Sequence, residues 1–461
     1  MSIVGAVAVP HPPIIIPEIG RGEEAKIEAT TKAYEAAADF IRTLNPDTIV
    51  ITSPHATAYT DYFHISPGRA ARGDFSRFGA GSVQIQTSYD EEFVKTLSAE
   101  AEKANLPAGT LGEREPQLDH GTLVPLYFLR NAGLSAVPTV RIGLSGLSDD
   151  AHYRLGQLIA KTAEKLNRRV VMLGSGDLSH KLREDGPYGF AEEGPVLDAR
   201  IQEIFADADF LSLLQLSPQL REASAECGVG CFEIMAGALD GLAVKGELLS
   251  YEGPFGVGYG IATFTVEGPA DSRRYLEQFQ MARRREAADR KAHEDAYVQL
   301  ARAALESYIH DGKVIDVPPG LPDEMYTQRA GTFVSLKKHG RLRGCIGTIS
   351  ATKDSLAKEI IANALNAGTD DPRFPPVTAD ELPELVYSVD VLGESEPAQP
   401  ADLDAERYGV IVTNGWRRGL LLPNLEGVDS PQEQISIALS KAGISPEEPY
   451  SIERFEVVRH K

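Results

Sequence analysis

Three segments in the first half of the chain share one pattern, a short β-branched apolar run that ends in a turn and a histidine. They read IVGAVAVPH at residues 3–11, TIVITSPH at residues 48–55 and VVMLGSGDLSH at residues 170–180. Strands this apolar are typical of parallel sheets buried on both faces, and ligands of such sheets gather at the carboxyl ends of the strands. The pattern predicts an α/β fold in which three side chains meet at one sheet edge: His11, His55 and His180.

An imidazole can bind a divalent metal ion or exchange a proton near neutral pH. Three imidazoles at one edge therefore predict a metal site or an acid/base site. The alternative interpretation is a separately hydrogen-bonded histidine after each strand. The repetition of the pattern favours a shared site.

Composition limits the class of protein. The chain has 461 residues, more than one hydrophobic core normally supports, so we expect two domains. Its formal net charge of -21 argues against nucleic acid or an anionic membrane as a partner. Three cysteines are too few for a disulfide framework, and the apolar N-terminus is interrupted by prolines and lacks the basic region of a signal peptide. We therefore expect a cytoplasmic protein.

Strand-like and helical stretches alternate as far as residue 266, which is typical of an α/β layer fold. A charged stretch at residues 273–308, with apolar positions at helical spacing, predicts a helix that joins two folded units. We expect domains at residues 1–270 and 291–461, with a helical linker at residues 271–290. Residues 58–86 lack clear periodicity and are interpreted as a loop over the site. The expected helices and strands lie at residues 23–44, 91–104, 151–166 and 192–204, and at 137–142, 248–251, 261–266, 331–336, 387–392 and 409–412.

The third ligand of a metal site can come from the segment ECGVGCFE at residues 226–233. Oxygen-activating iron(II) commonly takes two histidines and one carboxylate, and this favours Glu226 over Glu233, which lies nearer the following helix. Cys227 is the alternative, because a thiolate prefers softer metal chemistry. A glycine-rich helix start with buried cysteines is the structural alternative for the segment.

Four motifs resemble the class III extradiol ring-cleavage dioxygenases of the LigB-like superfamily, over about residues 1–268. The motifs are HPP at 11–13, SPH at 53–55, LDHG at 118–121 followed by VPL at 124–126, and GSGDLSH at 174–180. The resemblance implies an N-terminal domain with a central mixed or parallel sheet flanked by helices, and opening of a catechol-type ring by Fe(II) and O₂. It also implies that His11, His55 and Glu226 bind iron, that His180 is the acid/base and that His120 lies beside the substrate. Asp177 is placed to orient His180.

The segment Glu226-Cys227-Gly228, together with Asp177-x-x-His180, is also similar to the Memo family, in which a cysteine takes the third metal position. That resemblance implies Cys227 as the ligand and copper or iron redox chemistry. Zinc is a weaker option on the same histidines. The chain is also expected to form a homodimer, and the substrate walls are expected to include Tyr59, Tyr62, Phe63 and Tyr188.

The segments LRGCIGTI at residues 342–349 and DPRFPPV at residues 371–377 resemble the AMMECR family over about residues 288–461. This resemblance implies a smaller α+β domain. Arg343 and Cys345 lie between glycines and suggest a nucleophile or an anion-binding turn, since a cation lowers the pKa of a nearby thiol. A buried cysteine on a strand is the alternative. AMMECR and Memo proteins are associated, as families, with a radical S-adenosylmethionine partner.

Overall fold

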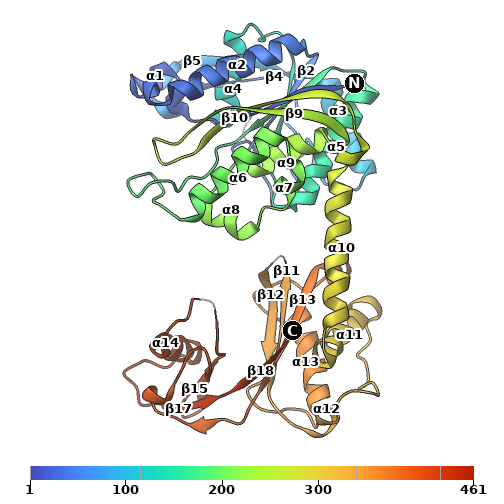
Figure 1. Ribbon diagram of the computed structural model, residues 1–461, viewed down its shortest axis with the longest axis vertical. Coiled ribbons are helices and arrows are strands. Elements are labelled where there is room, and N and C mark those ends of the chain that lie inside the picture. The colour runs from blue at the N-terminus through green and yellow to red at the C-terminus, as the bar shows by residue number, and fades with distance from the viewer. Residues whose placement is uncertain (1, 115, 339, 426) are drawn as a thin grey trace. The chain divides into compact units, whose positions relative to one another are not determined.

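The computed structural model describes residues 2–114, 116–338, 340–425 and 427–461. The chain divides into two compact units, Met1–Ala282 and Arg283–Lys461, and each is described by itself (Figure 1). None of the helices in these described ranges combines the length and the apolar character that a membrane-spanning helix needs.

The first unit is built on a six-stranded mixed sheet in the order β7-β2-β8-β1-β10-β9. Strands β7, β2, β8 and β1 are parallel, and β10 and β9 continue the sheet as an antiparallel pair. The α/β fold with a mixed sheet is therefore confirmed. The strands are β1 (Ile3–Val9), β2 (Thr48–Ser53), β7 (Thr139–Gly143), β8 (Val170–Ser175), β9 (Leu242–Glu252) and β10 (Tyr259–Pro269).

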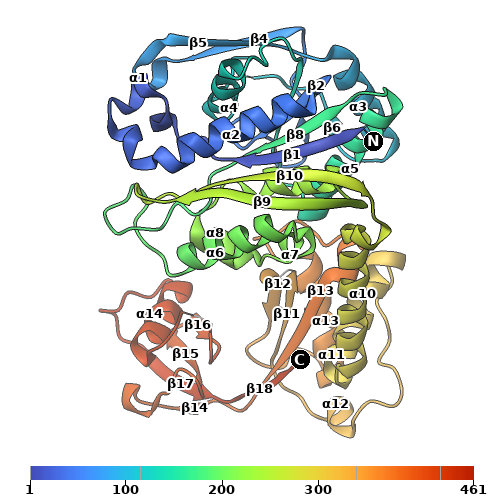
Figure 2. The ribbon, with the colours of Figure 1, turned by 45° about the horizontal axis from the view of Figure 1, so that its top comes forward.

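Helices cover both faces of this sheet (Figure 2). The core on one face includes Ala37 and Phe128 from α2 and α4, and the core on the other includes Leu97, Ile159 and Phe232 from α3, α5 and α9. Burial on both faces explains why the parallel strands are almost wholly apolar. The helices are α1 (Pro17–Gly20), α2 (Glu28–Leu44), α3 (Glu91–Lys103), α4 (His120–Asn131), α5 (Asp149–Lys165), α6 (Glu193–Asp207), α7 (Phe210–Leu214), α8 (Pro218–Ser224) and α9 (Val229–Ala238).

The three histidine-bearing strands are neighbours in the sheet. Strand β8 lies between β2 and β1, with Thr52 level with Gly174, and Val9 level with Ser175. Their carboxyl ends therefore lie side by side. This register places the three following turns at one edge of the sheet.

The segment at residues 58–86 is not the irregular loop that we expected. It contains the short strand β3 (Phe63–His64), which pairs with β6 (Ala108–Gly109), and an antiparallel hairpin of β4 (Ala70–Phe75) and β5 (Ala80–Ser88). In β5, buried and exposed side chains alternate strictly from Ser82 onward. This period of two is the pattern of a strand with one buried face.

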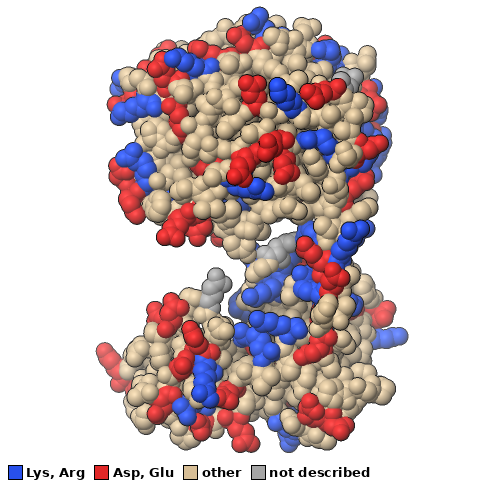
Figure 3. All heavy atoms as spheres, in the orientation of Figure 1, with Lys and Arg blue, Asp and Glu red and all other residues tan. Residues whose placement is uncertain are grey.

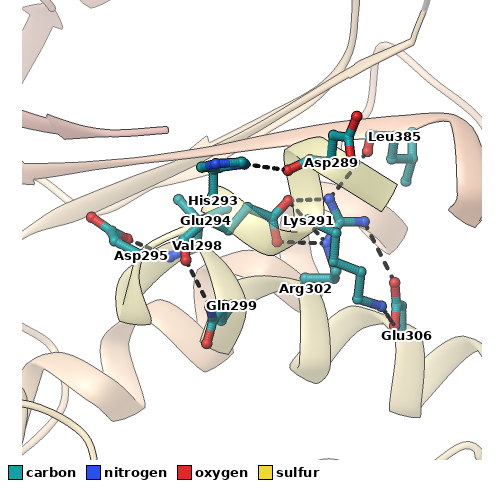
Figure 4. A network of polar contacts seen from close by, with 10 residues as sticks. All are labelled: Asp289, Lys291, His293, Glu294, Asp295, Val298, Gln299, Arg302, Glu306 and Leu385. Carbon is teal, nitrogen blue, oxygen red and sulfur yellow. Dashed lines mark hydrogen bonds and ion pairs between the residues drawn. The ribbon is translucent and has the colours of Figure 1, made fainter. Parts of the chain in front are cut away.

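The expected single helix at residues 273–308 is two helices, α10 (Tyr275–His293) and α11 (Ala296–Asp311). The Asp295 carboxylate accepts hydrogen bonds from the backbone N–H groups of Tyr297 and Val298 and so begins a new helix. Beside this break, Glu294 is paired with the buried guanidinium of Arg302 (Figure 4). A cap and a buried ion pair therefore define the joint.

The second unit contains two four-stranded sheets, in the orders β12-β11-β13-β18 and β14-β17-β15-β16. Helices α11 and α13 pack on one face of the first sheet and α14 packs on the second, which confirms an α+β architecture (Figure 1). Its other elements are α12 (Asp323–Thr327), β11 (Thr332–Lys338), β12 (Arg341–Gly347), α13 (Leu356–Thr369), β13 (Leu385–Leu392), β14 (Glu396–Pro397), β15 (Gly409–Asn414), β16 (Arg417–Leu421), α14 (Pro431–Ala442), β17 (Ser451–Phe455) and β18 (Val457–His460).

Candidate metal centre

His11 follows β1 and is almost fully buried. Its Nδ1 atom lies 3.0 Å from the Ser175 Oγ atom, and that hydroxyl lies 2.6 Å from the carbonyl oxygen of Gly121. A carbonyl oxygen only accepts, so the single hydroxyl proton of Ser175 goes to Gly121 and His11 Nδ1–H donates to Ser175. The lone pair of His11 is therefore on Nε2, which faces the other histidines.

His55 follows β2, and its Nε2 atom lies 3.0 Å from His11 Nε2. The backbone N–H of His55 donates to Ser53 Oγ at 3.2 Å, and the Ser53 hydroxyl donates to Asp119 Oδ1 at 2.6 Å. The side chain of His55 is exposed, in contrast to His11. The turn after β2 is thus fixed by hydrogen bonds while the imidazole stays accessible.

His120 is the first residue of α4, and Asp119 caps that helix by accepting from Thr122 N–H at 3.0 Å. The His120 ring lies 4.0 Å from the His55 ring and 5.3 Å from the His11 ring, between centroids. The Asp119 carboxylate is held in turn by the buried Arg141 guanidinium, with an N–O distance of 3.1 Å. Sequence reasoning did not identify this supporting role of Asp119, although its place three residues before Thr122 is a helix-cap signal.

The electrostatics favour neutral imidazoles. Burial, followed by the charge of His55, lowers the pKa of His11 to about 3. Burial and the charges of His55 and His11 lower the pKa of His120 to about 4, and burial lowers the pKa of His55. Neutral histidines carry the lone pairs that a metal ion needs.

A thiol and a carboxylate complete this cluster. Cys227 Sγ lies 3.7 Å and Asp177 Oδ2 3.8 Å from His11 Nε2. Burial raises the pKa of both the Cys227 thiol and the Asp177 carboxyl. Two groups of three residues therefore have ligand atoms within 4.8 Å of one another. One group is His11, His55 and His120, and the other is His11, Asp177 and Cys227.

Glu226, the expected carboxylate ligand, bonds to Arg221 and to the start of α9. Its Oε1 atom accepts from Arg221 Nε at 2.9 Å, and its Oε2 atom accepts from the backbone N–H of Val229 at 2.8 Å. Both oxygens are therefore committed to Arg221 and to the first turn of α9, and it is the next residue, Cys227, that approaches His11. Glu233 is buried and also bonded to Arg221, at 3.1 Å.

His180 is half-buried, and its buried Nδ1 atom has no hydrogen-bond partner in the described part of the chain. Its ring contacts Tyr188 at 5.1 Å between centroids. Burial is the largest cause that lowers the pKa of His11 and of His55, and the charge of His180 is a smaller one. The expected orienting bond between Asp177 and His180 is not formed, and the Asp177 carboxylate accepts from the backbone N–H of His11 at 2.8 Å.

Of the aromatic residues expected to line the substrate site, Tyr188 lies beside the cluster and Phe63 does not. Tyr188 lies beside His180, but Phe63 is fully buried against His152 and lines no open site. Phe78, at the turn between β4 and β5, contacts His120 at 5.4 Å between centroids. The segment at residues 58–86 therefore reaches the histidine cluster, as expected, but does so as a hairpin and not as a loop.

In the second unit, Arg343 and Cys345 lie on strand β12 and not in a turn. Arg343 forms a two-point ion pair with Glu381, at 2.9 and 2.8 Å, and donates to the carbonyl oxygen of Pro375. Its role in the fold is therefore to tie β12 to the segment before β13. Cys345 is half-buried and accepts a hydrogen bond from Ser335 Oγ at 3.2 Å.

The residues of the cluster fit a metal ion. Two nitrogen ligands at about 2.1 Å from one ion, at right angles to each other, are about 3.0 Å apart. The Nε2 atoms of His11 and His55 have this separation, and the Ser175 bond directs the lone pair of His11 toward the same point. A half-buried thiol and a buried carboxylate beside them can supply the negative charge that a divalent ion requires.

Comparison with known proteins identifies the family of each unit. Residues 5–262 match the catalytic LigB subunit of aromatic ring-opening dioxygenase, and residues 298–460 match AMMECR1. The chain therefore belongs to the LigB family and carries an AMMECR1 domain in its second unit.

The relatives share one or both parts. Protein CA_C1420 of Clostridium acetobutylicum is 42% identical over 469 residues, covering 100% of both chains. A Thermotoga maritima protein is 51% identical over 171 residues, 36% of this chain and 98% of its own. The crystal structure of uncharacterized protein PH0010 from Pyrococcus horikoshii is 33% identical and covers 36% of this chain and 89% of its own, with a TM-score of 0.34.

Proposed function

We propose that the first unit is a metal-dependent oxygenase that opens the ring of a small aromatic diol with Fe(II) and O₂. The observation that carries the proposal is the position of His11 Nε2, which lies 3.0 Å from His55 Nε2 and 3.7 Å from Cys227 Sγ and so belongs to both possible ligand groups. A thiolate carries the same single negative charge as the carboxylate of a two-histidine, one-carboxylate site. The ligand set that we propose is therefore His11, His55 and Cys227, in place of Glu226.

When bound, the Fe(II) ion would supply positive charge and open positions for a catecholate and O₂. The protein's part in the reaction is positioning and proton transfer. The imidazole of His180, which is half-buried beside Tyr188, would take a proton from a diol hydroxyl and return it later. His120, at the start of α4, would donate a hydrogen bond to a substrate oxygen.

The test uses the full chain, isolated without oxygen, loaded with Fe(II) and given a panel of catechols and O₂. We expect a ring-opened product that absorbs visible light. His180→Ala should abolish turnover and retain iron. His293→Ala, at the exposed end of α10, should change neither the turnover nor the iron content. Iron-loaded protein that converts no catechol in a broad panel would refute the proposal.

The position of Cys227 favours one further candidate, a Memo-like redox protein that holds copper or iron and works with a radical S-adenosylmethionine partner. Thiolate ligands select copper and iron–sulfur chemistry more readily than carboxylates do. Metal analysis of protein isolated without added ions separates the two functions. Bound copper together with no product from any catechol would support this candidate.

A further inference from the structure

The second unit has a sheet face that the proposed oxygenase chemistry does not use. Along β11 the side chains of Val334 and Leu336 lie in the helical core, and Ser335 lies half-buried on the opposite face. Ser335 is level with Cys345 on β12 and with Ser388 on β13. Level residues of neighbouring strands share a face. A thiol and two hydroxyls therefore form a row of small polar side chains across three strands.

Arg373 is fixed at one end of this row. Its Nε and one terminal nitrogen donate to both oxygens of Asp371, at 2.9 and 2.7 Å, and the same nitrogen donates to the carbonyl oxygen of Cys345 at 3.2 Å. Asp371 is 3% exposed and also accepts from Cys345 N–H at 2.9 Å. The Arg373 side chain is 54% exposed. A buried carboxylate thus holds a solvent-accessible guanidinium beside Cys345.

Two more cations, on other elements, interact electrostatically with Cys345. Arg459 on β18 is bound to Asp390, and the charge of Cys345 contributes to raising its pKa. Lys441 on α14 interacts electrostatically with both Cys345 and Arg373. Within the described residues, Lys441 forms no ion pair with a carboxylate. Figure 3 shows Lys and Arg side chains gathered over β11 and β12 in this unit.

A cation that lacks a counter-ion and lies near a second cation is stabilised by a bound anion. We propose that the face formed by Cys345, Ser335 and Ser388, with Arg373, Lys441 and Arg459 around it, is a second ligand site that binds a small molecule through an oxyanion. The ligand's carboxylate or phosphate lies between Arg373 and Lys441, and its organic part lies over the thiol.

This site does not depend on the proposed oxygenase activity. Positive side chains beside Cys345 attract an anionic molecule toward the sulfur. Ser335, Ser388 and Cys345 are each half-buried, so this part of the face keeps some contact with solvent. The site therefore brings an anionic molecule next to the sulfur of Cys345.

The test compares alkylation of Cys345 in the full chain by anionic iodoacetate and by neutral iodoacetamide, read by mass spectrometry of the peptide that contains it. We expect the rate ratio of iodoacetate to iodoacetamide to exceed that of an unstructured cysteine peptide by about fivefold. Lys441→Gln should lower the ratio about threefold. Lys358→Gln removes a positive charge from an exposed position of α13 in the same unit and should leave the rate ratio unchanged.

Protection experiments identify the oxyanion. Inorganic phosphate or acetate is added during alkylation by iodoacetamide, and the anion that slows the reaction in wild type but not in Lys441→Gln defines the group that binds. A ratio equal to that of the free peptide, or equal effects of Lys441→Gln and Lys358→Gln, would overturn the proposal.

Discussion

Ser175 determines which nitrogen of His11 carries the proton. The hydroxyl of Ser175 gives its own proton to the Gly121 carbonyl at 2.6 Å and therefore accepts from His11 Nδ1–H at 3.0 Å. Partners of this kind orient a ligating imidazole and raise its basicity. The bond also joins the end of β8 to α4, so the same serine fixes the histidine of β1 relative to His120.

Replacing Ser175 should weaken metal binding without removing a ligand. Ser175→Ala leaves His11 Nδ1–H without an acceptor, and we expect the affinity for Fe(II) to fall about 10- to 100-fold, as for other lost partners of metal-bound histidines. Anaerobic equilibrium dialysis measures the change. Ser98→Ala, on α3 away from the cluster, is the control, and equal affinity in both variants would show that Ser175 plays no such part.

Cys227 and Glu226 should respond differently to substitution. Cys227→Ser replaces the sulfur 3.7 Å from His11 Nε2, and we expect the protein to be isolated without its metal ion. Glu226→Gln should keep the ion and lower stability by about 1–2 kcal/mol, because it weakens the ion pair with Arg221 and a cap of α9. Metal analysis and urea denaturation of both variants make the comparison. Retention of metal by Cys227→Ser with loss from Glu226→Gln would restore the carboxylate as the third ligand.

The ion pair of Glu381 and Arg343 should make the second unit sensitive to acid. Hydrogen bonds from Arg343 lower the pKa of Glu381 to about 2 from an ordinary value of 4.5. A lowered pKa in the folded state means that the stabilisation is present above about pH 4.5 and is lost as the pH falls through about 2.

We therefore expect Glu381→Gln to destabilise the unit by about 1–2 kcal/mol at pH 7, a value limited by the partial exposure of the pair. The difference from wild type should shrink as the pH falls from 4.5. Hydrogen exchange of β12 peptides reports it. Glu394→Gln, at an exposed position, should show neither effect, and a Glu381→Gln difference that persists below pH 2 would contradict the ion-pair explanation.

The local sequence predicts the strands that build the site. Burial on both faces requires the apolar runs at residues 3–9, 48–53 and 170–175, and the carboxyl ends of parallel strands lie at one edge, so the placement of His11 and His55 follows from pattern alone. The order β2-β8-β1 does not follow, because it depends on pairing between distant segments.

The local pattern could not decide which of two adjacent residues, Glu226 or Cys227, approaches His11. The bonds of Glu226 to Arg221 and to the backbone N–H of Val229 hold its carboxylate, and Cys227 turns toward His11. The hairpin of β4 and β5 was predictable from the alternation after Ser82, a signal that the many glycines and arginines of the segment obscured. The contact between Phe78 and His120 depends on how that hairpin packs, which residue spacing does not report.

The joint between α10 and α11 depends on a buried ion pair. Arg302 and Glu294 are 7% and 8% exposed, and the Arg302 guanidinium lies 4.3 Å from the centre of the Tyr387 ring on β13. Arg302→Met leaves the Glu294 carboxylate buried without a partner, and we expect a loss of about 3–5 kcal/mol, seen as faster hydrogen exchange in α11. The double variant Arg302→Met with Glu294→Gln should recover most of this loss, since no charge then stays buried. If the double variant is as unstable as Arg302→Met alone, the packing of Arg302 on Tyr387, and not the ion pair, is what holds the joint.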